Sequence, residues 1–283
     1  MNMDQNDLSE MLETAVVAAR SAGQRAMEEI DFVKASVKKP GELVTQTDIR
    51  CQQLIVDTIK RKYPDHGFIA EEGEQGKMLK YRPRAGESIW WAVDPIDGTN
   101  NFAHQIPIFA VSIAALYNGE PIAGAIFEPA TDSMYTAVKG GEAQLNGRHI
   151  TAGEEQINEF ASVALDSHFG DNMPGWVCEI MRRTRFRNFG TTALHFGYVA
   201  KGSLAAAIVC TPKLWDIAAG AVVVESGGGI ITDWQGNKIF PIDLDGYEGQ
   251  AFRTLAANGK VHPQIVDIIN SKESRFAEHP LPE

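Results

Sequence analysis

The sequence has only three cysteines, Cys51, Cys178 and Cys210, and they form no C-x-x-C pair. It therefore lacks the disulfide framework of a small secreted protein and the thiolates of a structural zinc site. None of its seven histidines occurs in an H-x-H or H-E-x-x-H group. Any metal site in this chain therefore has to be built from oxygen ligands. These absences favour a reduced, cytoplasmic protein.

Excess basic charge and long apolar runs are also missing. The formal net charge is −11, which argues against nonspecific binding to nucleic acid or to an anionic membrane. The longest apolar stretches, 109–116 and 204–210, are too short to span a bilayer, and the polar residues 1–13 do not resemble a signal peptide. With 283 residues, 44% of them hydrophobic and 22% charged, the chain predicts one large globular domain or two packed ones.

The most informative stretch is Ile89–Phe102, which reads IWWAVDPIDGTNNF. Its first five residues predict a buried strand, which ends where Asp94 meets Pro95. Residues 97–99 (DGT) predict a helix start, whose free N–H groups suit a phosphate. Two carboxylates at such a strand end repel each other unless a cation lies between them, and Mg²⁺ is the natural candidate. A tight Asx turn that only caps a helix explains this motif about equally well.

Two helices and a strand are predicted ahead of this motif. Apolar residues at helical spacing predict helices over 8–30 and from Thr45 to Tyr63, the second with Cys51, Leu54, Ile55 and Ile59 facing inward. Asp48 lies in its first turn, where the helix dipole alone explains a carboxylate.

A short strand is predicted over 67–70, running into Glu71, and a polar surface loop over 74–87. If the strands 67–70 and 89–93 are neighbours in one sheet, Glu71 and Asp94 emerge at adjacent strand ends.

After the motif, hairpins give way to alternating strands and helices. The predicted hairpin strands are 109–117, 121–127, 133–138 and 142–145, with turns at Asn118-Gly119 and Asn146-Gly147. The later strands are 161–165, 185–189, 204–209, 230–233 and 254–257, and the later helices are 176–183, 191–200, 215–226 and 263–269. We expect an N-terminal α+β half over 1–150 and a C-terminal α/β half over 151–283, packed as one catalytic unit, with a loose tail from Ser271.

Several separated segments together resemble the inositol monophosphatase family of Mg²⁺-dependent, lithium-sensitive phosphatases. The matching segments, in chain order, are 43–48 (LVTQTD), 71–72 (EE), 91–102 (WAVDPIDGTNNF), 190–193 (GTTA), 214–220 (LWDIAAG) and 225–228 (ESGG). The resemblance covers roughly residues 8–270. It implies a layered αβαβα sandwich of the inositol monophosphatase and sugar phosphatase type, usually as a homodimer.

The resemblance also implies a centre of two to three Mg²⁺ ions. Glu71, Asp94 and the backbone carbonyl of Ile96 are the implied ligands of one ion. Asp94, Asp97 and Asp216 are implied for a second, with Asp94 bridging the two so that the cations cancel the repulsion between the acids. A third, weaker ion near Glu71 is typical of the family.

The implied reaction is hydrolysis of a phosphomonoester by a metal-activated water. Glu71 and Thr99 are implied to position that water, while Asp48 accepts a hydrogen bond from the Thr99 hydroxyl. The residues implied to contact the substrate are Asp97, Gly98, Thr99, Gly190, Thr191 and Thr192.

The motifs leave the substrate open. Inositol 1-phosphate or a related polyol or sugar phosphate is expected, with histidinol phosphate, fructose 1,6-bisphosphate and nucleotide bisphosphates as alternatives. The family's inositol phosphatases commonly carry an acid seven positions before the residue equivalent to Asp216, where this chain has Val209. This departure predicts weaker selectivity for inositol 1-phosphate, unless the local alignment shifts and Thr211 or Lys213 supplies the polar contacts.

Two other interpretations compete with this one. Haloacid-dehalogenase-type phosphatases form an aspartyl-phosphate at a D-x-D-G-T motif that ends their first strand, whereas this chain has D-x-x-D-G-T a third of the way along. The second alternative interpretation is a non-enzymatic regulator, because bacterial members of the family can also bind the transcription machinery. The acidic charge gives no support for direct nucleic-acid binding but does not exclude a protein partner.

Overall fold

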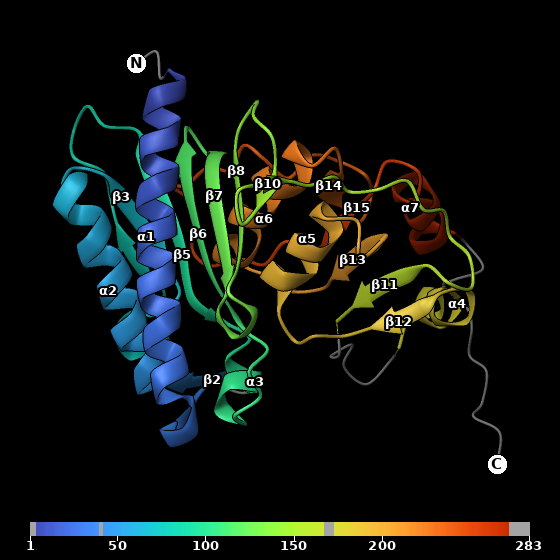
Figure 1. Ribbon diagram of the computed structural model, residues 1–283, viewed down its shortest axis with the longest axis horizontal. Coiled ribbons are helices and arrows are strands. Elements are labelled where there is room, and N and C mark those ends of the chain that lie inside the picture. Colours follow the sequence, from blue (N-terminus) through green and yellow to red (C-terminus); the bar gives the residue numbers. More distant parts are fainter. Residues whose placement is uncertain (1–3, 40–41, 167–172, 272–283) are drawn as a thin grey trace.

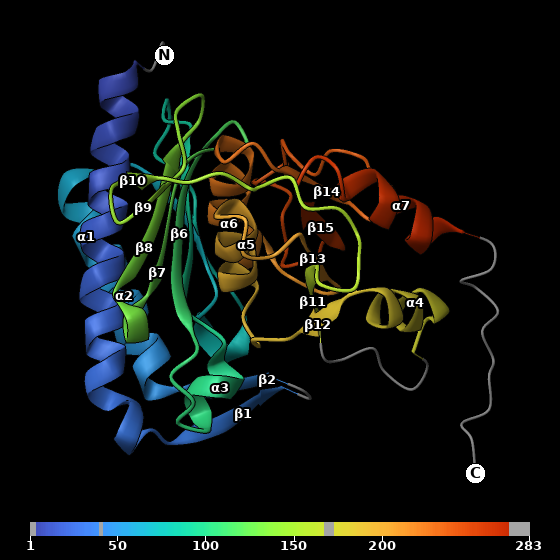
Figure 2. The ribbon, with the colours of Figure 1, turned by 45° about the vertical axis from the view of Figure 1, so that its right-hand side comes forward.

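The computed structural model describes residues 4–39, 42–166 and 173–271, which form five alternating layers of helix and sheet (Figures 1 and 2). Helices α1 and α2 cover one face of a large sheet, α5 and α6 lie between this sheet and a smaller one, and α4 and α7 cover the outer face of the smaller sheet. The bounds are α1 (Gln5–Glu29), α2 (Gln46–Lys62), α3 (Thr99–Ala103), α4 (Gly175–Arg183), α5 (Thr192–Ala200), α6 (Leu214–Ser226) and α7 (His262–Asn270). The predicted layered α+β class is confirmed.

The large sheet has eight strands in the order β10-β9-β8-β7-β6-β5-β3-β4. Their bounds are β3 (Gly67–Ala70), β4 (Leu79–Tyr81), β5 (Ile89–Asp97), β6 (Ala110–Tyr117), β7 (Glu120–Glu128), β8 (Ser133–Val138), β9 (Gln144–Leu145) and β10 (Arg148–His149). Strands β3 and β5 are parallel neighbours, and the Glu71 amide donates to the Val93 carbonyl at 3.2 Å. Glu71 and Asp94 therefore do emerge at adjacent strand ends, as the sequence predicted.

The smaller sheet has five strands in the order β12-β11-β13-β15-β14, and a separate hairpin precedes α2. The bounds are β11 (Ser162–Leu165), β12 (Arg185–Arg187), β13 (Ala206–Val209), β14 (Ile230–Asp233) and β15 (Thr254–Ala257), with β1 (Ala35–Lys39) and β2 (Glu42–Thr45) in the hairpin. Strands β11, β12 and β13 run parallel, so their carboxyl ends share one edge.

Small residues let the helices lie close to the sheets. Helix α1 buries its alanines completely, and a Cβ on Gly23 would meet the Phe127 ring at 2.6 Å. Helix α6 is apolar on nearly every side because it is enclosed between the two sheets. Gly124 of β7 approaches the α6 backbone so closely that an added Cβ would lie 2.8 Å from the Ala219 carbonyl oxygen.

Some predicted details differ from the structure. Strands β1, β2, β4 and β10 were not predicted, and β4 lies inside the stretch expected to be a polar loop. Leu54, expected to face inward, is 39% exposed because it lies on the outer side of α2. The expected tail lies outside the described residues from position 272 onward. Across the described ranges, no helix is long and apolar enough to cross a bilayer.

Candidate active site

Two buried aspartates and a partly buried one converge at the carboxyl end of β5. Asp94, Asp97 and Asp216 each offer a carboxylate oxygen, and these atoms all lie within 4.8 Å of one another. The first two come from the large sheet, whereas Asp216 lies in the first turn of α6, more than a hundred residues later. Sequence segments far apart thus supply one cluster of oxygen atoms.

An irregularity in β5 brings the first two aspartates together. Side chains three positions apart on a regular strand point to opposite faces. Here the pairing of β5 with β6 shifts register between Asp94 and Asp97, and the Ile96 amide turns back to donate to Asp94 Oδ1 at 2.9 Å. The Asx turn considered as the alternative interpretation therefore exists, but it also aligns two carboxylates.

Asp97 also connects the cluster to α5. Its Oδ2 atom accepts hydrogen bonds from the Thr191 hydroxyl and the Ala193 amide, both at 2.5 Å. Thr191 is the N-cap of α5, so Asp97 lies at the positive end of that helix. This contact fixes the orientation of Asp97 relative to the second half of the chain.

Burial raises the pKa values of all three aspartates, and neighbouring acids of the cluster add to the rise for Asp94 and Asp216. Burial, followed by the charges of Glu71 and Asp97, raises the pKa of Asp94 well above its usual range. Burial raises the pKa of Asp97 to about 6, against its hydrogen bonds to α5. Burial and the charge of Asp97 raise the pKa of Asp216 to about 7. These acids are therefore costly to ionise together unless a cation neutralises them.

Glu71 lies at the same cavity but is paired with a lysine. Lys38 Nζ is 3.5 Å from Glu71 Oε1 and 2.8 Å from Glu72 Oε1, and it also donates to the Glu71 carbonyl at 3.3 Å. The Lys38 side chain is only 4% exposed. Burial raises the pKa of Glu71 well above its usual range, and the Lys38 charge opposes that rise. Lys38 lies between the two predicted helices, where no motif or apolar pattern singles it out.

Thr99 and Asp48 form a second contact beside the aspartates. Thr99 Oγ1 lies 3.2 Å from Asp48 Oδ1 and 3.0 Å from the Ile96 carbonyl oxygen, so its single proton can go to either acceptor. Asp48 Oδ2 accepts from the Thr45 amide at 2.9 Å and from the Thr45 hydroxyl. Burial raises the pKa of Asp48 to about 6. Asp48 therefore closes the capping box of α2 and also contacts Thr99.

Gly98 sets the turn between β5 and α3. Its φ of 101° lies in the left-handed region, and an added Cβ would stand 3.2 Å from the Ile108 carbonyl oxygen and 3.3 Å from the Gly190 carbonyl oxygen. Helix α3 then begins at Thr99, where the sequence predicted a helix start.

A cavity of about 720 Å³ opens over this cluster. Its lining includes the predicted residues Glu71, Asp94, Ile96, Asp97, Gly98, Thr99 and Asp216. It also includes residues that the sequence did not suggest, among them Lys38, Lys77, Met78, Lys80 and Glu248. The lysines occur in unpatterned polar segments, so only the folded chain brings them together.

Other predicted residues lie next to the cavity without lining it. Asp48 accepts a hydrogen bond from Thr99, and the N-cap residue Thr191 donates one to Asp97. Asp48, Gly190, Thr191 and Thr192 are not among the residues that line the cavity. Val209 is fully buried in the apolar core, while Thr211 and Lys213 do line the cavity. The polar contacts on this segment are therefore at 211 and 213.

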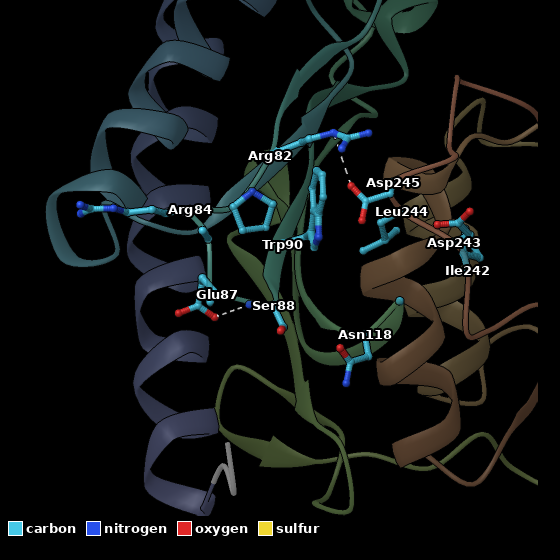
Figure 3. A pocket seen from close by; sticks show the side chains of 14 residues that line it. Arg82, Arg84, Glu87, Ser88, Trp90, Asn118, Ile242, Asp243, Leu244 and Asp245 are labelled. Atoms are coloured by element: carbon cyan, nitrogen blue, oxygen red, sulfur yellow. Dashed lines mark hydrogen bonds and ion pairs between the residues drawn. The ribbon is translucent and has the colours of Figure 1, made fainter.

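A smaller cavity of about 390 Å³ lies at the opposite end of β5 (Figure 3). Trp90 forms one wall, and Arg82 pairs with Asp245 at 3.4 Å near its rim. None of the predicted site residues lines it, and the titratable groups drawn there are mostly exposed. The chemistry-bearing residues therefore converge on the larger cavity.

The chain is similar to known proteins over nearly its whole length. The model of the inositol monophosphatase family matches residues 7–274. The inositol-1-monophosphatase of Mesorhizobium japonicum is 33% identical over 239 residues, which cover 82% of this chain and 86% of that protein. The fructose-1,6-bisphosphatase/inositol-1-monophosphatase of Thermotoga maritima is 32% identical over 266 residues, covering 92% and 95%. The Nus factor SuhB of Pseudomonas aeruginosa is 32% identical over 241 residues, covering 81% and 88%.

Solved structures share the same fold. The extragenic suppressor protein suhB from Bartonella henselae superposes with a TM-score of 0.81 at 28% identity, covering 93% of this chain and 99% of that one. The IMPase of Thermotoga maritima gives a TM-score of 0.78 at 29% identity, with coverages of 92% and 97%.

Proposed function

Because the chain belongs to the inositol monophosphatase family and is thus a phosphoric monoester hydrolase, we propose that it hydrolyses small polyol or sugar phosphates with Mg²⁺. The observation that carries this proposal is the cluster of Asp94, Asp97 and Asp216 within 4.8 Å, at a cavity shared by both halves of the chain. Inositol 1-phosphate is the first substrate to test.

The donor set fits a hard divalent cation. All three carboxylates are buried or partly buried oxygen donors whose pKa values are raised, which is the electrostatic cost that a bound cation removes. Asp94, Asp97 and Asp216 would hold one Mg²⁺, and Glu71, Asp94 and the Ile96 carbonyl another. When bound, these ions lower the pKa of a coordinated water and withdraw charge from the phosphate.

The protein's own groups orient the reactants. The Thr99 hydroxyl donates its hydrogen bond to Asp48 or to the Ile96 carbonyl, so its oxygen can accept a hydrogen bond from the attacking water. Glu71 is the second group proposed to position this water. The free amides of Gly98 and Thr99, which begin α3, are proposed to bind the phosphate.

We propose direct attack by water, without a covalent intermediate. The cavity lining, as far as the described residues form it, contains no cysteine, histidine or serine. The D-x-x-D-G-T spacing also differs from that of the aspartyl-phosphate enzymes. An added phosphate mass on Asp94 or Asp97 after rapid quenching would contradict this mechanism.

The decisive experiment is a phosphate-release screen. Inositol 1-phosphate, glycerol 2-phosphate, histidinol phosphate, fructose 1,6-bisphosphate and a nucleotide bisphosphate are each incubated with Mg²⁺, with EDTA, and with EDTA followed by excess Mg²⁺. We expect release that EDTA abolishes and Mg²⁺ restores, and that LiCl inhibits at matched ionic strength. Undiminished release in EDTA overturns the metal proposal.

A second candidate function comes from the relatives named Nus factor SuhB, which match this chain as well as the named phosphatases do, at 32% against 33% identity. Their similarity removes any basis for excluding nucleic acid as a partner. We propose a Nus factor role as the alternative. Complementation of a strain that lacks its own copy, with wild type and with Asp94→Asn, separates the two roles, because only the enzymatic one requires the aspartate.

The family also supports a homodimer in the cytoplasm as a proposal. Light scattering on the purified protein measures the oligomeric state directly, and fractionation of expressing cells measures the location.

A further inference from the structure

The active-site cavity combines an acidic floor with basic walls. Four lysines line it: Lys38, Lys77, Lys80 and Lys213. They come from β1, from the segment before β4, from β4 itself and from the residue that precedes α6. These lysines line the same cavity as the aspartates proposed to hold Mg²⁺. Each lysine can bind an anionic ligand only if a carboxylate of the protein does not already neutralise its ammonium group.

Two of the four lysines are already neutralised by carboxylates. Lys38 is paired with Glu71 and Glu72, as described above. Lys80 Nζ donates to the carbonyls of Asp245 at 2.9 Å and Tyr247 at 2.7 Å, and it lies 3.6 Å from Glu248 Oε1. Both ammonium groups therefore serve the fold, and Lys80 ties β4 to the segment that follows β14.

The other two lysines keep their charge available. Lys213 Nζ donates to one neutral acceptor, the Gly249 carbonyl at 2.7 Å, which leaves two of its three N–H groups for a ligand. Lys77 is exposed at the cavity rim. In the described part of the chain, no carboxylate lies within ion-pair distance of either ammonium group.

Besides Glu71 and the aspartates, the acids Glu42 and Glu248 line the cavity and could accept hydrogen bonds from a polyol, but Glu248 lies 3.6 Å from Lys80 and the charge of Glu42 acts on Lys38. Position 209, where an acid could accept hydrogen bonds from sugar hydroxyls, holds a fully buried valine that does not line the cavity. The polar residues of this segment that do line it are Thr211 and Lys213, and a lysine can only donate. Lys213, which donates only to a neutral carbonyl, and the exposed Lys77 therefore favour a leaving group that carries acceptor oxygens with negative charge.

We propose that the preferred substrate is a small phosphomonoester with a second anionic group, a phosphate or a carboxylate, bound by Lys213 and Lys77. This inference rests on the proposed phosphatase function and names the substrate class of that site. The scissile phosphate lies at the aspartate cluster, and the second anion lies against the two lysines. Charge-assisted hydrogen bonds from both ammonium groups orient the leaving group.

Matched pairs of esters test this assignment. Glycerol 2-phosphate and 2-phosphoglycerate differ by one carboxylate, and inositol 1-phosphate and inositol 1,4-bisphosphate differ by one phosphate. We expect kcat/KM to favour the member with the second anion by roughly 10- to 100-fold at low salt. The preference should shrink as KCl is raised, because screening weakens an exposed ion pair.

Variants locate the preference on the two lysines. Lys77→Gln and Lys213→Gln should each lower the ratio of kcat/KM within a pair several-fold, whereas Lys77→Arg and Lys213→Arg should largely keep it. Lys238→Gln removes the same charge from an exposed position outside the cavity lining and serves as the matched control. The ratio within each pair is insensitive to a general loss of activity, so a partly damaged variant still gives a result.

The outcomes distinguish this inference from the proposed function. A wild-type ratio near one, or a ratio that neither glutamine variant changes, overturns the inference while the phosphatase function stands. Failure to release phosphate from any of the four esters in Mg²⁺ overturns the proposed function and this inference with it.

Discussion

At the scale of single residues, the carboxylates of the site have too few cationic side chains nearby to neutralise them. Asp94 is 2% exposed, and its nearest charges are the acids Glu71, Asp97 and Asp216. Lys38 compensates Glu71 and Glu72 but is not among the charges that act on Asp94. The protein without metal therefore keeps protons on some of these acids, and a divalent cation has to displace them.

Asp94→Asn tests this residue most directly. We expect kcat to fall at least about 100-fold, because the proposed bridging ligand between two cations is lost. We also expect Mg²⁺ to raise the melting temperature of wild type but not that of the variant. Phosphate release and thermal unfolding with and without Mg²⁺ measure the two effects.

Asp57→Asn, on the exposed side of α2, is the control for the loss of one carboxylate and should behave as wild type in both assays. Normal activity in Asp94→Asn would contradict the ligand assignment.

His195 provides a residue-scale test that is independent of the metal. Its ring is 1% exposed; Nε2 accepts from the Phe189 amide at 3.0 Å, and Nδ1 has no partner within the described structure. Burial lowers the pKa of His195 to about 4, from an ordinary value of 6.5. The folded state thus favours the neutral ring, so the stability that this contributes is present above pH 6.5 and is lost as the pH falls toward 4.

We therefore expect His195→Gln to lose less stability than wild type between pH 6.5 and 4. The upper limit of the difference is roughly 3 kcal/mol, the free energy that corresponds to the lowered pKa of this buried group. Urea unfolding of both proteins at several pH values measures it. The aspartates with raised pKa values add stability as the pH falls, which is opposite to the effect of His195. Both proteins are therefore measured at saturating Mg²⁺, and only the difference between them is interpreted. Parallel pH curves would show that His195 does not titrate as stated.

At the scale of elements, the sequence predicted those with a strong apolar pattern. Strands β3, β8, β14 and β15 begin and end where the pattern indicated. Strands β3, β8 and β15 are almost entirely buried, whereas β14 buries only its two central residues. The missed strands β1, β2, β4 and β10 are short and lie at sheet edges or in the separate hairpin. Such strands form through backbone pairing to a neighbour, which leaves no period in their side chains.

The same distinction applies to the candidate site. Asp94, Asp97 and Asp216 belong to motifs that can be recognised locally, so resemblance identified them. Lys38 and Lys80 come from the missed strands β1 and β4, and their positions depend on pairing partners distant in the chain. The acidic part of the site was therefore predictable, whereas its basic part, apart from Lys213, required the folded chain.

Two predicted hairpin turns offer a matched test of element packing. Gly119 and Gly147 both follow an asparagine with positive φ and have φ values of 79° and 75° themselves. An added Cβ on Gly147 meets nothing within 4 Å, so Gly147→Ala should cost only the left-handed strain of about 1 kcal/mol. A Cβ on Gly119 would lie 1.9 Å from the Ile242 carbonyl oxygen.

Gly119→Ala should therefore destabilise the protein by clearly more than Gly147→Ala, by about 2 kcal/mol or more beyond it. Chemical denaturation of the two variants gives the comparison. Equal losses would mean that the β6–β7 turn does not pack on the 242–245 segment in solution. Neither substitution should abolish the Mg²⁺-dependent rise in melting temperature.

At the scale of the whole molecule, the site and the core are shared by both halves of the chain. Helix α6 packs between the two sheets, and Ser112 of β6 donates to the Trp215 carbonyl at 3.0 Å. Asp97 binds the N-terminus of α5, and Asn101 donates to the Phe189 carbonyl at 2.7 Å. The proposed metal ligands from the first and second halves therefore lie together only when these contacts are made.

We therefore propose that residues 1–150 and 151–283 unfold as one cooperative unit that Mg²⁺ stabilises as a whole. At a free Mg²⁺ concentration about 100 times its dissociation constant, linkage predicts roughly 2.7 kcal/mol of stabilisation, or about 5–10 °C in melting temperature. Calorimetry in EDTA and in Mg²⁺ should give a single transition that moves without splitting. Thr191→Val, which removes a hydrogen bond between the halves but no proposed ligand, should lower the transition in both conditions while preserving the shift. Two transitions, of which Mg²⁺ moves only one, would mean that the metal is bound within one half and that Asp216 is not its ligand.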